Sequence, residues 1–364
     1  LPAVHQKRHL IMSNFNSLAA RLGIHHPIIQ APMAGVATPK LAAAVCNAGG
    51  LGSLGIGASS VPQAREMIEQ THALTSRPFN VNVFCHEPPK RNAAQEQAWL
   101  EHLAPLFKEC GAALPTALDE IYKSFLADDE AFNMLLETRP AVVSFHFGLP
   151  PSEQIQALRQ AGIYTLATAT NLEEARHIQA SGVDAIVAQG IEAGGHRGIF
   201  KPDTMDERLS TSVLIRLLVR EINLPIIAAG GIMDGQGIKA ALALGAAAAQ
   251  LGTAFILCPE SAANEGYRNN LKSEHAGATV LTSALSGRPA RGIRNRFINH
   301  AEQAVGMKPP AYPIAYDAAK QLNAAASKLG NDTFAAHWAG QAAPLARTLP
   351  ADQLISALVE ELSV

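Results

Sequence analysis

The sequence predicts an α/β fold, a (β/α)8 TIM barrel with an added, mainly helical substrate or lid domain. Short apolar segments alternate with helical segments from residue 27 to residue 255, which indicates βαβ units and a parallel sheet. The chain has 364 residues, of which 48% are hydrophobic, enough for one large barrel with an insertion. Polar or glycine residues interrupt the apolar segments at their ends, where the functional groups of such barrels lie.

Each expected strand runs into a glycine, a proline or a polar residue. In FNVNVF, Asn80 and Asn82 alternate with apolar residues, which is the period-two pattern of a strand. The segments expected as strands are, in chain order, PIIQAPMAG, LGSLGIG, FNVNVF, AVVSFHFG, IYTLATAT, AIVAQG, PIIAAGG and AAAQLGTAF. Their carboxyl ends carry Met33, Asn82, His146, Thr168, Gln189, Gly231 and Gln250 to Thr253.

Helix-capping residues follow several of these strands. Thr38 precedes Pro39 and is a suitable N-cap, because its hydroxyl can accept a free N–H of the first turn. Asn171 followed by Glu174 predicts a capping box for a helix that ends near Ser181. Further helices are expected over residues 39–47, about 60–72 and 152–160.

The alternation of strands and helices defines the expected domain boundaries. Residues 13–85 and 141–260 are predicted to form the barrel, and residues 346–364 a C-terminal helix. The segments expected to form the helical insertion or lid, with no strands beyond Pro259, are 86–140 and 261–345. Residues 1–12 are interpreted as a leader, since they lack the apolar core of a signal peptide.

Composition excludes several classes of partner. The formal net charge is −2 and no basic run occurs, which argues against nucleic acid or an anionic membrane surface as the main partner. No apolar stretch reaches the roughly 18 to 20 residues that span a bilayer. The 4 cysteines form no C-x-x-C pair, so we expect a reduced, cytoplasmic chain without a metal site.

Glycine-rich turns at three strand ends indicate a ligand held by the main chain. AIVAQGIEAGGHRG (residues 185–198) exposes backbone N–H groups with no side chain in the way, which suits an anion or a flat ring. AAGGI (228–232) and QLGT (250–253) close the last two strands, where barrels commonly bind phosphate, and Thr253 can add a hydroxyl donor. The alternative is that these are ordinary tight turns.

A further glycine pattern is interpreted as a chance match to a dinucleotide-binding motif. Gly50, Gly52 and Gly55 spell G-x-G-x-x-G, the nominal dinucleotide fingerprint. That fingerprint needs a strand before the glycines and an acidic residue at a later strand end. Here a helix precedes the glycines, and the nearby acids Glu66 and Glu69 lie within an expected helix.

Two groups of side chains are candidates for chemistry. His146 ends an apolar strand between two phenylalanines, where its pKa can be tuned for proton transfer or for polarising an anion; the alternative is a core histidine bonded to a carbonyl. His196, in the glycine loop, is expected to support a ligand rather than to exchange protons. Tyr312, Tyr316 and Lys320 have the spacing of one helix face, which fits either a lid over an anionic substrate or an ordinary surface helix.

Taken together, these motifs resemble the nitronate monooxygenase family, formerly called 2-nitropropane dioxygenases, and specifically its class I members. Single motifs such as AAGGI are shared with other flavin barrels, whereas SFHFG together with EAGGHRG is more specific. The match runs from about Pro27 to Lys320. The motifs that carry it are QAPMAG, LAAAVCNAGGLGSLG, FNVNVF, SFHFG, AQGIEAGGHRG, AAGGI and QLGTAF.

The resemblance implies a barrel that binds FMN non-covalently and has His146 as its active-site histidine. The substrate pocket that it implies consists of Tyr122, Tyr312, Tyr316 and Lys320. The flavin contacts that it implies are Met33, Asn82, Gln189, Gly194, Gly231, Gln250, Leu251, Gly252 and Thr253.

The reaction that the resemblance implies is oxidation of an anionic alkyl nitronate by O2 to a carbonyl compound and nitrite, through one-electron reduction of the flavin. Propionate 3-nitronate is the substrate that the family suggests, and the expected assembly is a monomer or a weak homodimer. Two alternatives stay open at this point. One is a related FMN barrel that oxidises NAD(P)H and reduces a quinone or an enoyl thioester, and the other is a non-catalytic barrel that binds a phosphate ligand.

Overall fold

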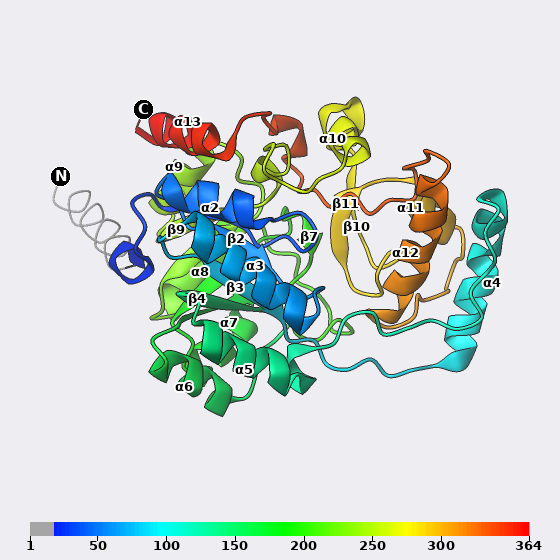
Figure 1. The fold of residues 1–364 in the computed structure, drawn as a ribbon, viewed down its shortest axis with the longest axis horizontal. Helices are drawn as coiled ribbons and strands as arrows, with labels where there is room; N and C mark the ends of the chain where they lie inside the picture. The colour runs from blue at the N-terminus through cyan, green and yellow to red at the C-terminus, as the bar shows by residue number, and fades with distance from the viewer. Residues whose placement is uncertain (1–17, 364) are drawn as a thin grey trace.

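The computed structural model describes residues 18–363, and its central feature is a nearly closed barrel of parallel strands (Figure 1). Neighbouring strands follow the order β1-β9-β8-β6-β5-β4-β3-β2. A parallel bridge between Ile29 and Leu51 joins the two ends of this order. The predicted barrel is therefore confirmed. Its strands are β1 (Ile28–Gln30), β2 (Ser53–Gly55), β3 (Asn80–Phe84), β4 (Val142–His146), β5 (Tyr164–Ala169), β6 (Ala185–Gln189), β8 (Ile226–Ala229) and β9 (Ala248–Leu251).

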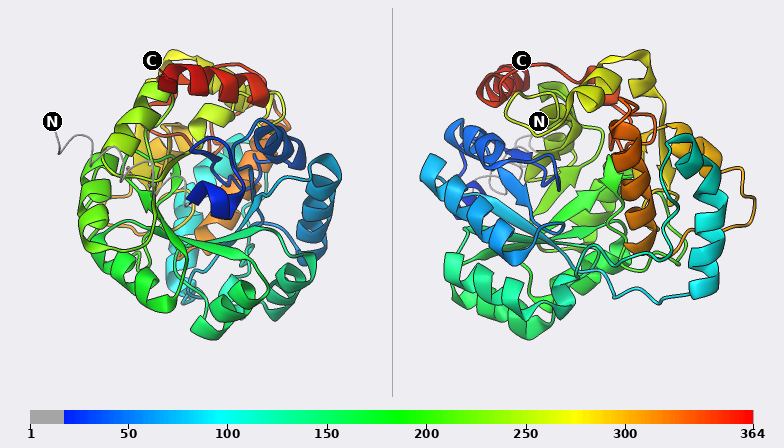
Figure 2. Two further views of the ribbon diagram at one scale, coloured as in Figure 1. Left: turned by 90° about the vertical axis from the view of Figure 1, so that its left-hand side faces the viewer. Right: turned by 45° about the vertical axis from the view of Figure 1, so that its right-hand side comes forward.

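Helices surround the strands as an outer ring, which is seen along the barrel axis in the left view of Figure 2. The ring helix α13 packs against both α9 and α2, and α3 packs against α2 and α5. The ring consists of α2 (Pro39–Asn47), α3 (Val61–Leu74), α5 (Asp129–Thr138), α6 (Ser152–Gln160), α7 (Leu172–Ser181), α8 (Thr211–Glu221), α9 (Gly235–Ala243) and α13 (Ala351–Ser363).

The predicted N-cap of α2 is confirmed. For α7 the N-cap is confirmed, but the reciprocal bond of the capping box is not. The Thr38 hydroxyl accepts the N–H of Leu41 at 3.0 Å, as expected for an N-cap. The Asn171 side chain accepts the N–H of Glu174 at 2.9 Å. The Glu174 carboxylate, however, accepts the N–H of Thr170 at 2.7 Å. In a capping box this carboxylate would accept the N–H of Asn171. Here it accepts the N–H and the hydroxyl of Thr170 instead, one residue earlier.

The barrel interior is a packed apolar core that is closed at one end by the start of the described chain. Leu18 and Leu22 are fully buried on a short helical segment, and they belong to one cluster with Ile29 and Leu166 of the strands. Side chains from alternate strand positions fill small barrels in this way. The packed end leaves the opposite rim, at the carboxyl ends of the strands, for a site.

The remaining elements gather beyond the carboxyl ends of the strands (Figure 1). A buried cluster that includes Trp99, Phe297 and Leu322 joins α4 to α11 and α12. These elements are α4 (Ala93–Glu109), α10 (Glu265–Lys272), α11 (Arg296–Ala301), α12 (Ile314–Ser327) and two strands, β10 (Thr279–Thr282) and β11 (Ala290–Ile293).

The expectation of no strands beyond Pro259 is wrong. β10 and β11 form a three-stranded antiparallel sheet with β7 (Gly195–His196), which lies inside the glycine-rich stretch. The added, mainly helical domain is therefore not confirmed, and the domain boundaries stay a prediction. The interpreted leader, residues 1–12, lies outside the described residues. Within residues 18–363, no helix combines the length and the apolar composition needed to cross a membrane.

Candidate active site

A cavity of about 410 Å³ lies at the carboxyl ends of the barrel strands. The structure brings all but one of the predicted site residues to its wall. The exception is Leu251, whose side chain is buried in a core cluster beneath the loop. The predicted residues that line the cavity are His146, Tyr122, Tyr312, Tyr316, Lys320, Met33, Asn82, Gln189, Gly194, Gly231, Gln250, Gly252 and Thr253.

One side of the cavity is formed by glycine main chain. Gly230 and Gly231 follow β8 with φ angles of +123° and +70°, a backbone region that residues with a Cβ rarely adopt. A Cβ on Gly194 would lie 2.5 Å from the nitrogen of Gly340. Thr253 accepts the N–H of Gly340 through its hydroxyl at 3.0 Å, which leaves the hydroxyl proton free to donate. This cradle of bare main chain and one hydroxyl fits an anionic group such as a phosphate.

His146 ends β4 and is held at both ring nitrogens. Its Nε2 donates to the carbonyl of His196 at 3.1 Å, so in the neutral ring Nδ1 accepts from the Thr168 hydroxyl at 3.0 Å. Burial, together with the charges of Arg288 and Arg197, lowers its pKa to about 4, although the hydrogen bond with His196 acts in the opposite direction. His146 is therefore a neutral, fixed imidazole at neutral pH.

His196 is a second imidazole on the cavity wall. The sequence predicts only that it supports a ligand. Its Nε2 lies 2.9 Å from the Ser286 hydroxyl, and that hydroxyl donates to the carbonyl of Arg288 at 3.1 Å. Ser286 must therefore accept from Nε2, which leaves Nδ1 as the lone-pair nitrogen. Within residues 18–363 this Nδ1 has no hydrogen-bond partner, and His196 lines the cavity. Burial, with the charges of His146 and Arg288, lowers the pKa of His196 to about 3.

Aromatic side chains enclose the mouth of the cavity. Tyr316 and Lys320 lie on the first turns of α12, whereas Tyr312 precedes this helix, so the expected face is only partly helical. The Lys320 ammonium lies 5.2 Å from the ring centre of Tyr316 and 5.5 Å from that of Tyr122. Burial raises the pKa of Tyr316 to about 12, so its phenol keeps its proton and can donate a hydrogen bond. The four residues face one another as one cationic, hydroxyl-bearing wall.

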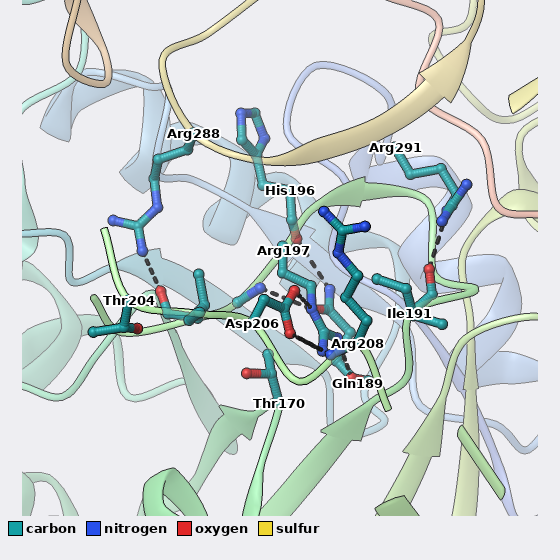
Figure 3. Close-up of polar contacts among 12 residues, drawn as sticks. Thr170, Gln189, Ile191, His196, Arg197, Thr204, Asp206, Arg208, Arg288 and Arg291 are labelled. Atoms are coloured by element: carbon teal, nitrogen blue, oxygen red, sulfur yellow. Dashed lines mark hydrogen bonds and ion pairs between the residues drawn. The ribbon is translucent and has the colours of Figure 1, made fainter. Parts of the chain in front are cut away.

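An ion pair of Arg197 and hydrogen bonds of the Gln189 side chain hold the glycine-rich stretch in place (Figure 3). Arg197 donates to Asp206 at 2.8 and 3.0 Å and to the carbonyl of Gln189. The Gln189 amide donates to the carbonyl of His196 at 3.0 Å and accepts the N–H of Gly198 at 2.7 Å. The amide of Gln189 thus supports the loop, and its side chain is already engaged within the protein.

Two further aromatic residues line the cavity without any sequence signal. Tyr267 lies on α10, and Trp338 lies beyond α12. The indole N–H of Trp338 donates to the Tyr316 hydroxyl at 3.2 Å, and the ring centres of Trp338 and His196 are 5.2 Å apart. Among the described residues, no group of three or more His, Cys, Asp or Glu side chains could bind a metal ion.

A parallel barrel with a cradle of bare main chain and two imidazoles in one cavity defines a barrel enzyme that acts on a small molecule. The profile of a family described as nitronate monooxygenase matches residues 16–361. A nitronate monooxygenase of Paraburkholderia phytofirmans is 59% identical over 346 residues, 95% of this chain and 94% of that protein.

Solved structures agree with this similarity. A nitroalkane oxidase from Streptomyces ansochromogenes superposes with a TM-score of 0.87 at 40% identity, over 93% of this chain and 96% of that one. FabK from Thermotoga maritima superposes with a TM-score of 0.72 at 29% identity, over 95% and 96%. The chain belongs to the nitronate monooxygenase family, and it is an oxidoreductase.

Proposed function

We propose that this protein is an FMN-dependent enzyme that oxidises alkyl nitronates with O2 to a carbonyl compound and nitrite. The observation that carries the proposal is one cavity in which bare glycine main chain lies on one side and neutral imidazoles, phenols and an ammonium lie on the other. The first surface suits a phosphate and a flat ring, and the second suits a small anion.

FMN is the cofactor that this cavity fits. The loops after β8 and β9, with Gly231 and Thr253, would hold its phosphate, and Met33, Asn82 and Gln250 line the space for its ring. When bound, FMN supplies the capacity to accept an electron from the nitronate. The protein's own residues bind and orient the reacting groups and exclude water from them.

Lys320 and the tyrosines are the proposed receptors of the substrate anion. The Lys320 ammonium at the mouth would bind a remote carboxylate, such as that of propionate 3-nitronate. Because their pKa values are raised, the phenols of Tyr122, Tyr312 and Tyr316 stay protonated and can donate to the nitronate oxygens.

The histidines favour a substrate that is already an anion. A general base works best when its pKa lies near the working pH, whereas burial lowers the pKa of His146 to about 4 and that of His196 to about 3. Such imidazoles are weak bases but remain good hydrogen-bonding groups. We therefore assign His146 as the active-site histidine that fixes the loop next to the ring, and Nδ1 of His196 as the nitrogen that faces the substrate.

An oxygen-electrode assay of the purified, flavin-loaded protein tests the proposal. Propionate 3-nitronate, an alkyl nitronate without a carboxylate, a neutral nitroalkane and NADH are compared side by side. The proposal predicts O2 consumption and nitrite release with both nitronates. Rapid anaerobic bleaching of the flavin by NADH, with no turnover of nitronates, would instead establish the NAD(P)H-dependent reductase.

A further inference from the structure

Buried arginines lie around the glycine-rich stretch, and they differ in their counter-charges (Figure 3). Arg197, Arg288 and Arg291 are only 3%, 3% and 6% exposed. A buried guanidinium costs free energy unless an acidic group or hydrogen bonds compensate it. Arg197 has a bidentate ion pair with Asp206, whereas neither Arg291 nor Arg288 has an ion pair among the described residues.

Of the two arginines without an ion pair, Arg288 is the one that packs against the aromatic side chains next to the cavity. It donates to the main-chain carbonyls of Ile199 and Phe200, and its guanidinium carbon lies 4.4 Å from the ring centre of Phe147. Its Nε has no hydrogen-bond partner among the described residues. Within residues 18–363 no carboxylate lies at ion-pair distance from this guanidinium. Carbonyls and an aromatic face bind the cation but do not neutralise its charge.

The acidic groups that act on Arg288 do so from a greater distance. Tyr312 acts on it most strongly, followed by Glu174, Glu87 and Asp203. Glu174 is committed elsewhere, because its carboxylate accepts hydrogen bonds from Thr170 and from the N–H of Phe200. Burial raises the pKa of Glu174, whereas its hydrogen bonds with Phe200 and Thr170 lower it. Arg288 therefore has no carboxylate partner of its own next to the site.

Only a thin aromatic layer separates this charge from the cavity. The Phe147 ring that carries the guanidinium lies 5.4 Å from the ring of Tyr312 and 5.7 Å from that of His196, and both of these line the cavity. The intervening groups carry no charge of their own, because His146 and His196 have lowered pKa values and the phenol is protonated. A charge acts over a longer range through such a low-dielectric layer than it does through water.

We propose that Arg288 is an electrostatic positioning residue, whose charge, without an ion-pair partner, draws a small planar anion into the cavity without touching it. The inference rests on the proposed function in one respect, since the anion it would favour there is the nitronate. The binding of any planar monoanion tests it, because charge rather than turnover is what Arg288 contributes.

The experiment is anaerobic calorimetric titration of the flavin-loaded protein with nitrite and, separately, with neutral nitroethane at pH 6. Arg288→Met keeps the apolar stem and removes the charge, and Arg288→Lys keeps the charge. Arg291→Met is the matched control, a buried arginine that does not line the cavity. We expect Arg288→Met to raise the Kd for nitrite about tenfold, as a unit charge about 10 Å away predicts at an effective dielectric constant of about 20. The Kd for nitroethane should stay within about twofold.

The lysine variant and the control should bind nitrite within about threefold of the parent protein. An unchanged nitrite Kd in Arg288→Met, or equal weakening of both ligands, would overturn the inference. If Arg288→Met fails to fold, Arg288→Gln, which also removes the charge, decides: about tenfold weaker nitrite binding in this variant supports the inference, and unchanged binding overturns it. A protein that binds nitrite through Arg288 but turns over no nitronate would contradict the proposed function alone.

Discussion

At the scale of single residues, the two imidazoles of the cavity are distinguished by their hydrogen bonds. His146 uses both ring nitrogens within the protein, with Thr168 on one side and the carbonyl of His196 on the other. His196 uses only Nε2, on Ser286, and leaves Nδ1 for a ligand. The partner of Nε2 lies 90 residues later in the chain, so no local pattern could have predicted this orientation.

The geometry predicts different effects of replacing the two histidines. His196→Asn should keep its flavin and lose about 100-fold in kcat/KM for a nitronate, because a positioned polar group that faces the reacting atoms contributes on this scale. His146→Asn should also lose activity, through displacement of the loop. The exposed His177→Asn serves as the control. Full activity in either active-site variant would refute the role proposed for that residue.

The same measurement carries a pH test. Since the pKa values of His146 and His196 are lowered to about 4 and about 3, both rings are neutral above pH 5 and gain a proton only at lower pH. The pH profile of the parent protein should therefore show no histidine ionisation between pH 6 and 8. An inflection near pH 6.5 that disappears in His196→Asn would contradict a neutral His196.

At the scale of elements, the strand-end loops position the site. The loop after β8 turns at Gly231, and the glycine-rich stretch after β6 is pinned as β7 against β11. The barrel strands and several helices were predictable because apolar runs, glycine breaks and caps such as Thr38 are local signals. β10 and β11 were not predictable, because each is only four residues long and β11 pairs with β7, which lies much earlier in the sequence.

The loop after β8 supports a matched pair of glycine substitutions. Gly231 has a φ of +70°, and a Cβ there would lie 3.1 Å from Cβ of Glu192. Gly162 has a φ of +84°, with no atom within 4 Å of such a Cβ. Both alanine variants should lose about 1 kcal/mol of stability through backbone strain.

Gly231→Ala should in addition raise the Kd for FMN about tenfold or more, because the cradle must shift, whereas Gly162→Ala should not. Urea unfolding measures the stability, and FMN fluorescence titration measures the affinity. Equal FMN affinity in the two variants would show that this loop does not bind the phosphate.

At the scale of the whole molecule, a barrel packed at one end by Leu18 and Leu22 leaves its other rim for a cavity. Elements from the C-terminal third, among them α12 with Tyr316 and Lys320, complete that cavity. Family motifs within the sequence predicted which residues line it. The contribution of Trp338 and Tyr267 could not be predicted, because it depends on how the chain beyond the barrel folds back over the rim.

A crystal structure of the protein grown with FMN tests the central claim most directly. The account predicts electron density for the phosphate against the loops after β8 and β9, with the flavin ring beside His146 and the imidazole of His196 open to the substrate side. Flavin bound anywhere other than the carboxyl rim of the barrel, or with its ring turned away from both histidines, would contradict it.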